Sequence, residues 1–386
     1  MKHKEDITTN SKDKGAYIQM INQIVNTDIT YPIDIDGLLE TAVKQGASDL
    51  HLVAGYPPAL RISGDITLLE YPAMKAKELE NMLMQILGEW QISELKKNLE
   101  LDFSYSIEGL SRFRGNIIVQ RGSYSAAFRV VPFVIPEFDG LGLIPDIKKL
   151  ADLSRGLVLV TGPTGSGKST TLASILDIIN KTKKANIVTI EDPIEFLHRH
   201  NQSMIEQREV GLDTHSFENA LRHVLRHDPD VIMIGEMRDL ESISIAMTAA
   251  ETGHLVFSTL HTQTAPLTIS RIVDIFTTEK REQVRQQLSN SLQAIIAQQL
   301  VPKAGNKGRV LAVEYMVNTA AVKNMIREGK EHQLYSVIQT SHLYGMQTMD
   351  QALIGLYKDC KITKETVFTY CIERQEVERL MRQAGG

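Results

Sequence analysis

The sequence predicts two domains of different class, a smaller α+β domain followed by a larger α/β domain built on a parallel sheet. Two observations predict this order. Residues 33–134 mix helical patterns with hairpin-like strands, whereas four short apolar runs separated by helical patterns follow residue 150. Continuous apolar runs of this kind are typical of strands buried on both faces of a parallel sheet. At 386 residues, the chain is long enough for two ordinary cores.

The first part of the chain supplies the α+β pattern. Residues 1–32 are interpreted as a polar N-terminal extension with room for one short helix. After it, "IDIDGLLETAVKQGA" predicts a helix, "SDLHLVAG" and "LRISGDI" predict paired strands, and "KAKELENMLMQILGEWQISELKKN" is helical. The alternating stretch from residue 101 to residue 132 breaks at Gly109 and Gly122, which predicts a small antiparallel sheet. These elements define an N-terminal domain over residues 33–134.

A change of pattern marks the second domain. The stretch "FVIPEFDGLGLIPDI" is rich in proline and glycine, so residues 135–150 are expected to be a linker. The runs "GLVLVTG", "ANIVTIEDP", "DVIMIGEMRD" and "HLVFSTLHT" predict the buried strands of the domain at residues 151–386. From about residue 280, including "REQVRQQLSNSLQAIIAQQL", the pattern predicts mostly helices.

Composition limits the class of protein. Apolar residues make up 42% of the chain and charged residues 23%, as in globular proteins that fold in water. No stretch approaches the roughly 20 apolar residues of a membrane-spanning helix, and the N-terminus lacks a signal-peptide core. A cytoplasmic protein is therefore expected, with docking on a membrane complex left open. The net charge of -5 argues mildly against a nonspecific nucleic-acid-binding protein, and two cysteines are too few for a four-cysteine zinc site.

A glycine-rich loop carries the strongest chemical signal. "GPTGSGKST" matches the P-loop pattern G-x-x-x-x-G-K-[ST], with a predicted strand before it and a helix after it. Such a loop turns backbone N–H groups toward phosphates, and the helix N-terminus adds its dipole. Lys168 is expected to neutralise the β- and γ-phosphates, and Ser169 to bind Mg²⁺. The predicted nucleotide contacts are Gly162, Pro163, Thr164, Gly165, Ser166, Gly167, Lys168, Ser169 and Thr170.

Acidic residues follow two of the predicted strands. Glu236 ends the run "DVIMIG", where strand ends face the ligand crevice, and it is a candidate Mg²⁺ ligand; a surface glutamate after a core strand is the alternative. "TIEDPIEF" contributes Glu191, Asp192 and Glu195, one of which could orient and deprotonate an attacking water. A solvated acidic turn is the simpler interpretation of that stretch taken alone.

Histidines and arginines complete the candidates. His254 and His261 lie at the two ends of one predicted strand, so they are poor joint ligands for one metal, although His261 is placed to sense a γ-phosphate. A structural role is the commoner one for either histidine. In the first domain, Arg114 and Arg129 belong to a basic stretch that also holds Arg112 and Arg121. These arginines either form a solvated basic face or reach a nucleotide on a neighbouring subunit.

The order of the motifs carries a family resemblance. P-loop, "TIEDPIEF", "GEMRD" and "ETGHLVFSTLHT" follow one another as in the secretion ATPases of type II and type IV systems. Within that family the chain resembles the PilT-like ATPases that retract type IV pili. "ASDLHLVAGYPPALRISGDI" is similar to the start of their N-terminal domain, and "AVKNMIREGK" is similar to a helix linked to retraction. The similarity covers about residues 33–380.

The resemblance implies a fold and roles for single residues. It implies a RecA-like ATPase core, a PAS-like N-terminal domain, and a hexamer that hydrolyses ATP with Mg²⁺. Glu195 matches the catalytic glutamate and Glu236 the Walker-B glutamate, while His254 and His261 match the histidine-box pair. Arg114 and Arg129 match arginines that contact nucleotide from the N-terminal domain. In the "AVKNMIREGK" helix, Val322, Lys323 and Met325 depart from the family pattern but keep its apolar and basic character.

The implied function is a motor that powers pilus retraction and twitching motility by disassembling pilin at the pilus base. Its implied partners are identical subunits, an inner-membrane platform protein and an accessory ATPase, at the cytoplasmic face of the membrane. Four alternatives stand beside it: an accessory, PilU-like retraction ATPase, an extension or type II secretion ATPase, a nucleic-acid translocase, and a non-hydrolysing scaffold. Extension and type II enzymes usually carry a four-cysteine zinc insertion, which this sequence lacks. Charge and motifs oppose the translocase, and the intact carboxylates oppose the scaffold.

Overall fold

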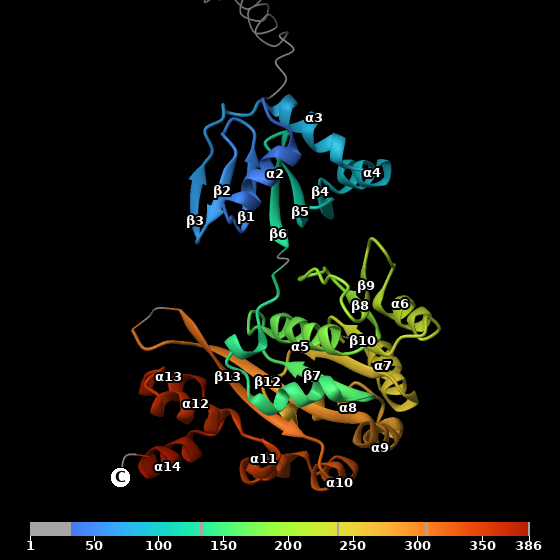
Figure 1. The fold of residues 1–386 in the computed structure, drawn as a ribbon, viewed down its shortest axis with the longest axis vertical. Helices are drawn as coiled ribbons and strands as arrows, with labels where there is room; N and C mark the ends of the chain where they lie inside the picture. The colour runs from blue at the N-terminus through green and yellow to red at the C-terminus, as the bar shows by residue number, and fades with distance from the viewer. Residues whose placement is uncertain (1–31, 132–133, 238, 306–307, 385–386) are drawn as a thin grey trace, which may run out of the picture. The chain divides into compact units, whose positions relative to one another are not determined.

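A computed structural model describes residues 32–131, 134–237, 239–305 and 308–384 (Figure 1). The chain divides into two compact units, Met1–Val130 and Val131–Gly386. Among the described residues, no helix is long and apolar enough to cross a membrane. The short helix considered possible in the N-terminal extension lies outside the described residues.

Over residues 32–130, the first unit is an antiparallel sheet with three helices. Its strand order is β3-β2-β1-β6-β5-β4. Alternate strand residues such as Leu50, Phe113 and Phe128 pack with helix residues such as Leu39 and Leu83 in one core. The strands are β1 (Asp49–Val53), β2 (Ala59–Ile62), β3 (Asp65–Leu68), β4 (Glu100–Ile107), β5 (Ser111–Gln120) and β6 (Ser123–Val131), and the helices are α2 (Ile35–Lys44), α3 (Ala76–Ile86) and α4 (Glu89–Asn98). The expected antiparallel sheet is confirmed.

The second unit contains a seven-stranded sheet in the order β13-β12-β7-β11-β10-β8-β9. All neighbouring strands run parallel except β12 and β13. The strands are β7 (Gly156–Thr161), β8 (Asn186–Glu191), β9 (Met204–Glu209), β10 (Val231–Ile234), β11 (Leu255–Leu260), β12 (Leu292–Pro302) and β13 (Arg309–Val317). The four apolar runs are β7, β8, β10 and β11, so the predicted parallel strands are confirmed.

Helices cover both faces of this sheet, as the two sides of the ribbon in Figure 1 show. Leu157 and Leu159 of β7 face a core shared with α6 to α11, whereas Val158 and Val160 face α5. A third core joins β12 and β13 to the last three helices. The helices are α5 (Lys168–Thr182), α6 (Phe217–Val224), α7 (Leu240–Thr252), α8 (Ala265–Asp274), α9 (Arg281–Ser291), α10 (Ala320–Glu328), α11 (Leu334–Thr340), α12 (Met349–Lys358), α13 (Lys364–Tyr370) and α14 (Arg374–Ala384).

One expectation is wrong in detail. The helix expected through "SLQAIIAQQL" ends at Ser291, and residues 292–302 form β12 instead. Pairing with β7 on one side and β13 on the other satisfies the backbone of this segment, and Ile295 and Ile296 enter cores on opposite faces. The segment 135–150, expected to be a linker, holds the 3-10 helices η1 (Phe138–Gly140) and most of η2 (Pro145–Asp152). Ile147 of η2 is buried beside α5, so this segment packs into the second unit.

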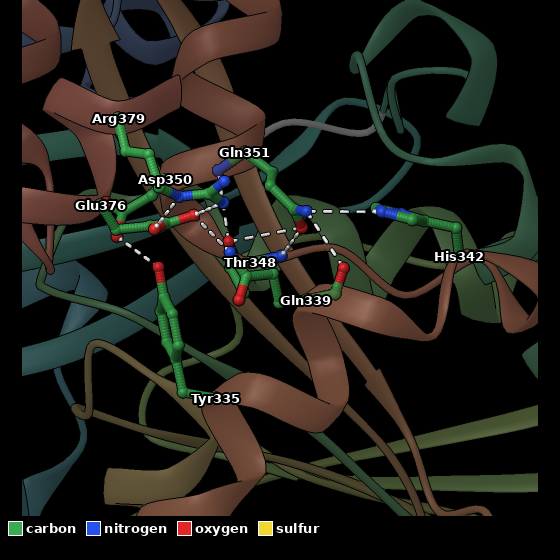
Figure 2. Close-up of polar contacts among 8 residues, drawn as sticks. All are labelled: Tyr335, Gln339, His342, Thr348, Asp350, Gln351, Glu376 and Arg379. Carbon is green, nitrogen blue, oxygen red and sulfur yellow. Dashed lines mark hydrogen bonds and ion pairs between the residues drawn. The ribbon is translucent and has the colours of Figure 1, made fainter. Parts of the chain in front are cut away.

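The C-terminal helices are joined by a buried carboxylate (Figure 2). Asp350 in the first turn of α12 is fully buried. It accepts hydrogen bonds from the N–H groups of Ile372 (2.8 Å) and Glu373 (2.9 Å) and from the Tyr335 hydroxyl (2.9 Å). Three donors compensate the loss of water around the charge, so α11, α12 and the start of α14 are held together.

Candidate nucleotide-binding site

The P-loop is shaped by glycines where β7 passes into α5. Gly162, Gly165 and Gly167 all have positive φ angles, a conformation that side chains disfavour. At Gly162 there is also no room for a side chain, because a Cβ would lie 2.3 Å from the Gln298 carbonyl oxygen. Within the described chain, no side chain caps the N-terminus of α5. The first N–H groups of α5 therefore suit a phosphate ligand.

Lys168 lies inside this loop. Its Nζ donates hydrogen bonds to the carbonyl oxygens of Gly162 (2.9 Å) and Pro163 (3.2 Å). Burial lowers the pKa of Lys168, while the charges of Glu236 and Glu195 act in the opposite direction. Both carboxylates are thus within electrostatic range of the ammonium group, and three residues singled out in the sequence meet at one loop.

Glu236 and His261 meet at the carboxyl ends of two neighbouring parallel strands. Glu236 follows β10, His261 follows β11, and His261 Nε2 lies 3.1 Å from Glu236 Oε1. The Thr259 hydroxyl donates to the Gly235 carbonyl (2.6 Å), which fixes the backbone beside Glu236. His254 precedes β11, and its Nδ1 lies 3.0 Å from the Ala249 carbonyl oxygen. The structure therefore brings only one of the two histidines to the P-loop edge.

The three carboxylates of "TIEDPIEF" occupy different environments. Glu191 is buried and accepts hydrogen bonds from the Thr189 hydroxyl (2.7 Å), Gln207 Nε2 (3.1 Å) and the Glu195 N–H (3.3 Å). Burial raises its pKa despite these bonds. Asp192 and Glu195 are exposed. Glu191 is therefore engaged in holding the loop, and Glu195 is the carboxylate left at the surface near Lys168.

The two candidate arginines of the first unit, Arg114 and Arg129, lie on one face of its sheet. Arg114 and Arg129 are exposed, and they alternate with the buried Phe113 and Phe128. Arg129 Nε donates to Asp49 Oδ1 over 2.9 Å. Burial alone would raise the pKa of Asp49, but hydrogen bonds from Ser48 and Arg129 outweigh it and the pKa is lowered. Arg129 is thus partly committed within its own unit, whereas no such ion pair involves Arg114 among the described residues.

Sequence reasoning missed several residues around the loop. Gln298 of β12 presses its carbonyl against Gly162, and its Nε2 donates to the Thr171 hydroxyl (2.8 Å). Gln207 and Glu209 of β9 bind the backbone beside Glu195. The sequence "MIEQRE" is mostly polar and does not indicate a buried strand. The one signal that could have revealed these residues is their spacing of two, which places both side chains on the same face of a strand.

Comparison with known proteins identifies the family. A family model described as type II/IV secretion system protein matches residues 28–365. The chain belongs to this family. It is 50% identical over 333 residues to the type IV pilus retraction ATPase PilT of Pseudomonas aeruginosa, a match that covers 86% of this chain and 96% of PilT. It is 39% identical over 353 residues to the type IV pilus ATPase PilU of the same organism, covering 92% of each chain.

A solved structure agrees with these relatives. A crystal structure of the pilus retraction motor PilT with bound ADP superposes with a TM-score of 0.84 at 49% identity, covering 90% of this chain and 99% of that one. The similarity therefore extends through both units of the chain. The expected membership of the secretion ATPases is confirmed.

Proposed function

We propose that this protein is an ATP-hydrolysing motor that powers type IV pilus retraction. One observation carries the proposal: Lys168, Glu195 and the Glu236–His261 pair gather at the P-loop in a chain that is 50% identical to a retraction ATPase. The second unit is then a RecA-like ATPase core, and the first unit a PAS-like domain. We further propose boundaries at 1–32, 33–134, 135–150 and 151–386.

The chemistry assigned to each residue follows from its surroundings. Backbone N–H groups of the P-loop and Lys168 hold the phosphates of ATP. Glu195, exposed beside the loop, orients and deprotonates the attacking water. His261 holds Glu236 in place and is positioned to respond to the γ-phosphate. Each role uses a contact or an exposure that the structure contains.

Magnesium fits the same site. Among the described residues, no group of three or more His, Cys, Asp or Glu side chains is arranged to hold a metal ion. Mg²⁺ in nucleotide enzymes needs no such cage, because one or two protein oxygens and the phosphates suffice. The Ser169 hydroxyl at the start of α5 and the Glu236 carboxylate are the proposed ligands. The ion would neutralise phosphate charge during transfer.

The assembly and its partners extend the proposal. We infer a homohexamer in which Arg114 and Arg129 contact nucleotide held by a neighbouring subunit, since both side chains are exposed. The ring would dock on an inner-membrane platform protein at the cytoplasmic face of the membrane, with a PilU-like ATPase as a further partner. Neither nucleic acid nor zinc is among the proposed partners.

Two substitutions test the site. Lys168→Ala removes the cation that faces the phosphates, so ATP binding should weaken. Glu195→Gln keeps the shape of the side chain and removes the base, so binding should persist while turnover falls roughly 10²-fold or more. Asp192→Asn, at an exposed neighbour in the same loop, is the matched control and should turn over ATP normally. Near-normal turnover in Glu195→Gln combined with loss in Asp192→Asn would move the base to Asp192.

A cellular experiment separates retraction from the related functions. Deletion of the gene should give hyperpiliated cells that do not twitch. Bald cells would indicate an extension ATPase instead. Normal twitching at low load with failure at high load would favour the accessory role that the PilU similarity raises.

A further inference from the structure

The edge strand β9 presents two polar side chains to the loop that carries Glu195. Gln207 and Glu209 are two residues apart on this strand, so they lie on the same face of the sheet. β9 runs parallel to β8, with Gln207 opposite Thr189 and Glu209 opposite Glu191. The loop that leaves β8 therefore passes directly beside both side chains.

Gln207 uses both ends of its amide on this loop. Its Nε2 donates to the Phe196 carbonyl oxygen (2.9 Å) and to Glu191 Oε1 (3.1 Å). Its Oε1 accepts from the His198 N–H (2.8 Å). One side chain thus fixes the backbone at two positions after Glu195 and the buried carboxylate that binds the N–H of Glu195.

Glu209 holds the other side of the same residue. This buried side chain accepts a hydrogen bond from the Ile194 N–H over 3.0 Å. Together with the bond from the Glu195 N–H to Glu191, the backbone before, at and after Glu195 is tied to β8 and β9. The Glu195 side chain itself remains exposed.

This arrangement matters because a catalytic base acts only from the right place. A displacement of about 1 Å in a reacting group can reduce a rate by roughly 10²-fold. A loop held only by its ends would let an exposed carboxylate sample many positions. Hydrogen bonds on both sides of Glu195 restrict the backbone without engaging the carboxylate, which stays available for water.

We propose that Gln207 is a positioning residue for ATP hydrolysis, which fixes the Glu195 loop on strand β9. This rests on the proposed role of Glu195. A purely structural role for Gln207 would make its loss harmful whether or not Glu195 can act as a base. A positioning role makes its loss harmful only when Glu195 is intact.

A double-mutant cycle separates these roles. Gln207→Leu has a similar volume and makes none of the three hydrogen bonds. Alone, it should lower kcat roughly 10-fold to 10²-fold with the KM for ATP unchanged. In the Glu195→Gln background, it should change the residual rate by less than about 2-fold. Equal fold-losses in both backgrounds would overturn the proposal.

Two further measurements keep the result interpretable. Gln207→Asn retains the amide but is one methylene shorter; it should also lower kcat, and it replaces Gln207→Leu if that variant fails to fold. Glu206→Gln, on the opposite face of β9, where Glu206 contacts His227 at the surface, is the matched control and should leave kcat unchanged. If Glu195→Gln alone retains normal turnover, the proposed base itself is refuted. If Glu195→Gln is inactive but the cycle is additive, only the positioning role is refuted.

Discussion

Glu314 in β13 makes the stability of the second unit depend on pH. The side chain is buried, and its two oxygens accept hydrogen bonds from the N–H groups of Ala265 (2.6 Å) and Met349 (3.2 Å). These are the first residues of α8 and α12. Burial raises the pKa of Glu314 to about 7, and the nearby charge of Asp350 acts in the same direction, against the two hydrogen bonds.

The sign and size of the effect follow from proton binding. Unfolded, Glu314 titrates at its ordinary pKa of 4.5, so between pH 4.5 and about 7 the folded state binds more protons. Stability from this group is complete below pH 4.5 and is lost as the pH rises through about 7. Each pKa unit corresponds to about 1.4 kcal/mol. The loss should therefore approach about 3 kcal/mol.

Glu314→Gln removes the titration and tests the reasoning. Urea unfolding of wild type and variant is followed by circular dichroism at pH 5 and pH 8. The difference in unfolding free energy should shift in favour of the variant by up to about 3 kcal/mol on going to pH 8. Taking the difference cancels other titrating groups, such as the half-buried His198, whose pKa is lowered to about 4 by desolvation.

The single tryptophan supplies an internal control. Trp90 lies in α4 of the first unit, so its fluorescence reports unfolding there and should be the same in both proteins. Parallel pH profiles for wild type and variant would refute the reasoning, since they would mean that Glu314 titrates alike in the folded and unfolded chain. A shift of opposite sign would do the same.

Two other predictions concern coupling and assembly. In α10, Arg327→Ala and Asn324→Ala change exposed residues and should abolish twitching while leaving most ATPase activity. Ile326 is fully buried, so its truncation to alanine should instead cost about 2–5 kcal/mol of stability. A joint loss of ATPase activity and motility in the exposed variants would assign α10 to the active site. Rings mixed from Lys168→Ala subunits and Arg114→Ala/Arg129→Ala subunits, each inactive alone, should regain partial ATPase activity, and the absence of recovery despite co-assembly would count against arginines shared between subunits.

The parts of the fold that sequence reasoning predicted are those with a strong local pattern. β7, β8, β10 and β11 are mostly apolar and almost wholly buried, because helices cover both faces of the sheet, and the P-loop is defined by residues close in sequence. Residues 292–302 carry apolar side chains at spacings that suit a helix as well as a strand. Only pairing with β7 and β13 decides between the two, and no local pattern contains that information.

The candidate site was predictable to a similar degree. Lys168, Glu195, Glu236 and His261 follow strands, so their meeting at one edge of the sheet follows from parallel topology. The hydrogen bonds of Gln207 and Glu314 depend on the order of the strands in the sheet. β9 is short and polar, and its place next to β8 is a tertiary property that the sequence "MIEQRE" does not display.

The position of β7 in its sheet has a consequence for synthesis of the protein. This strand pairs with β11 and β12, whose first residues come about a hundred residues or more later in the chain. The carbonyl oxygen that excludes a side chain at Gly162 belongs to Gln298 of β12. Long-range pairings of this kind form slowly and only after the later segment has left the ribosome. The surroundings of the P-loop are therefore completed only late on a nascent chain, and binding of ATP would indicate that β12 has joined the sheet.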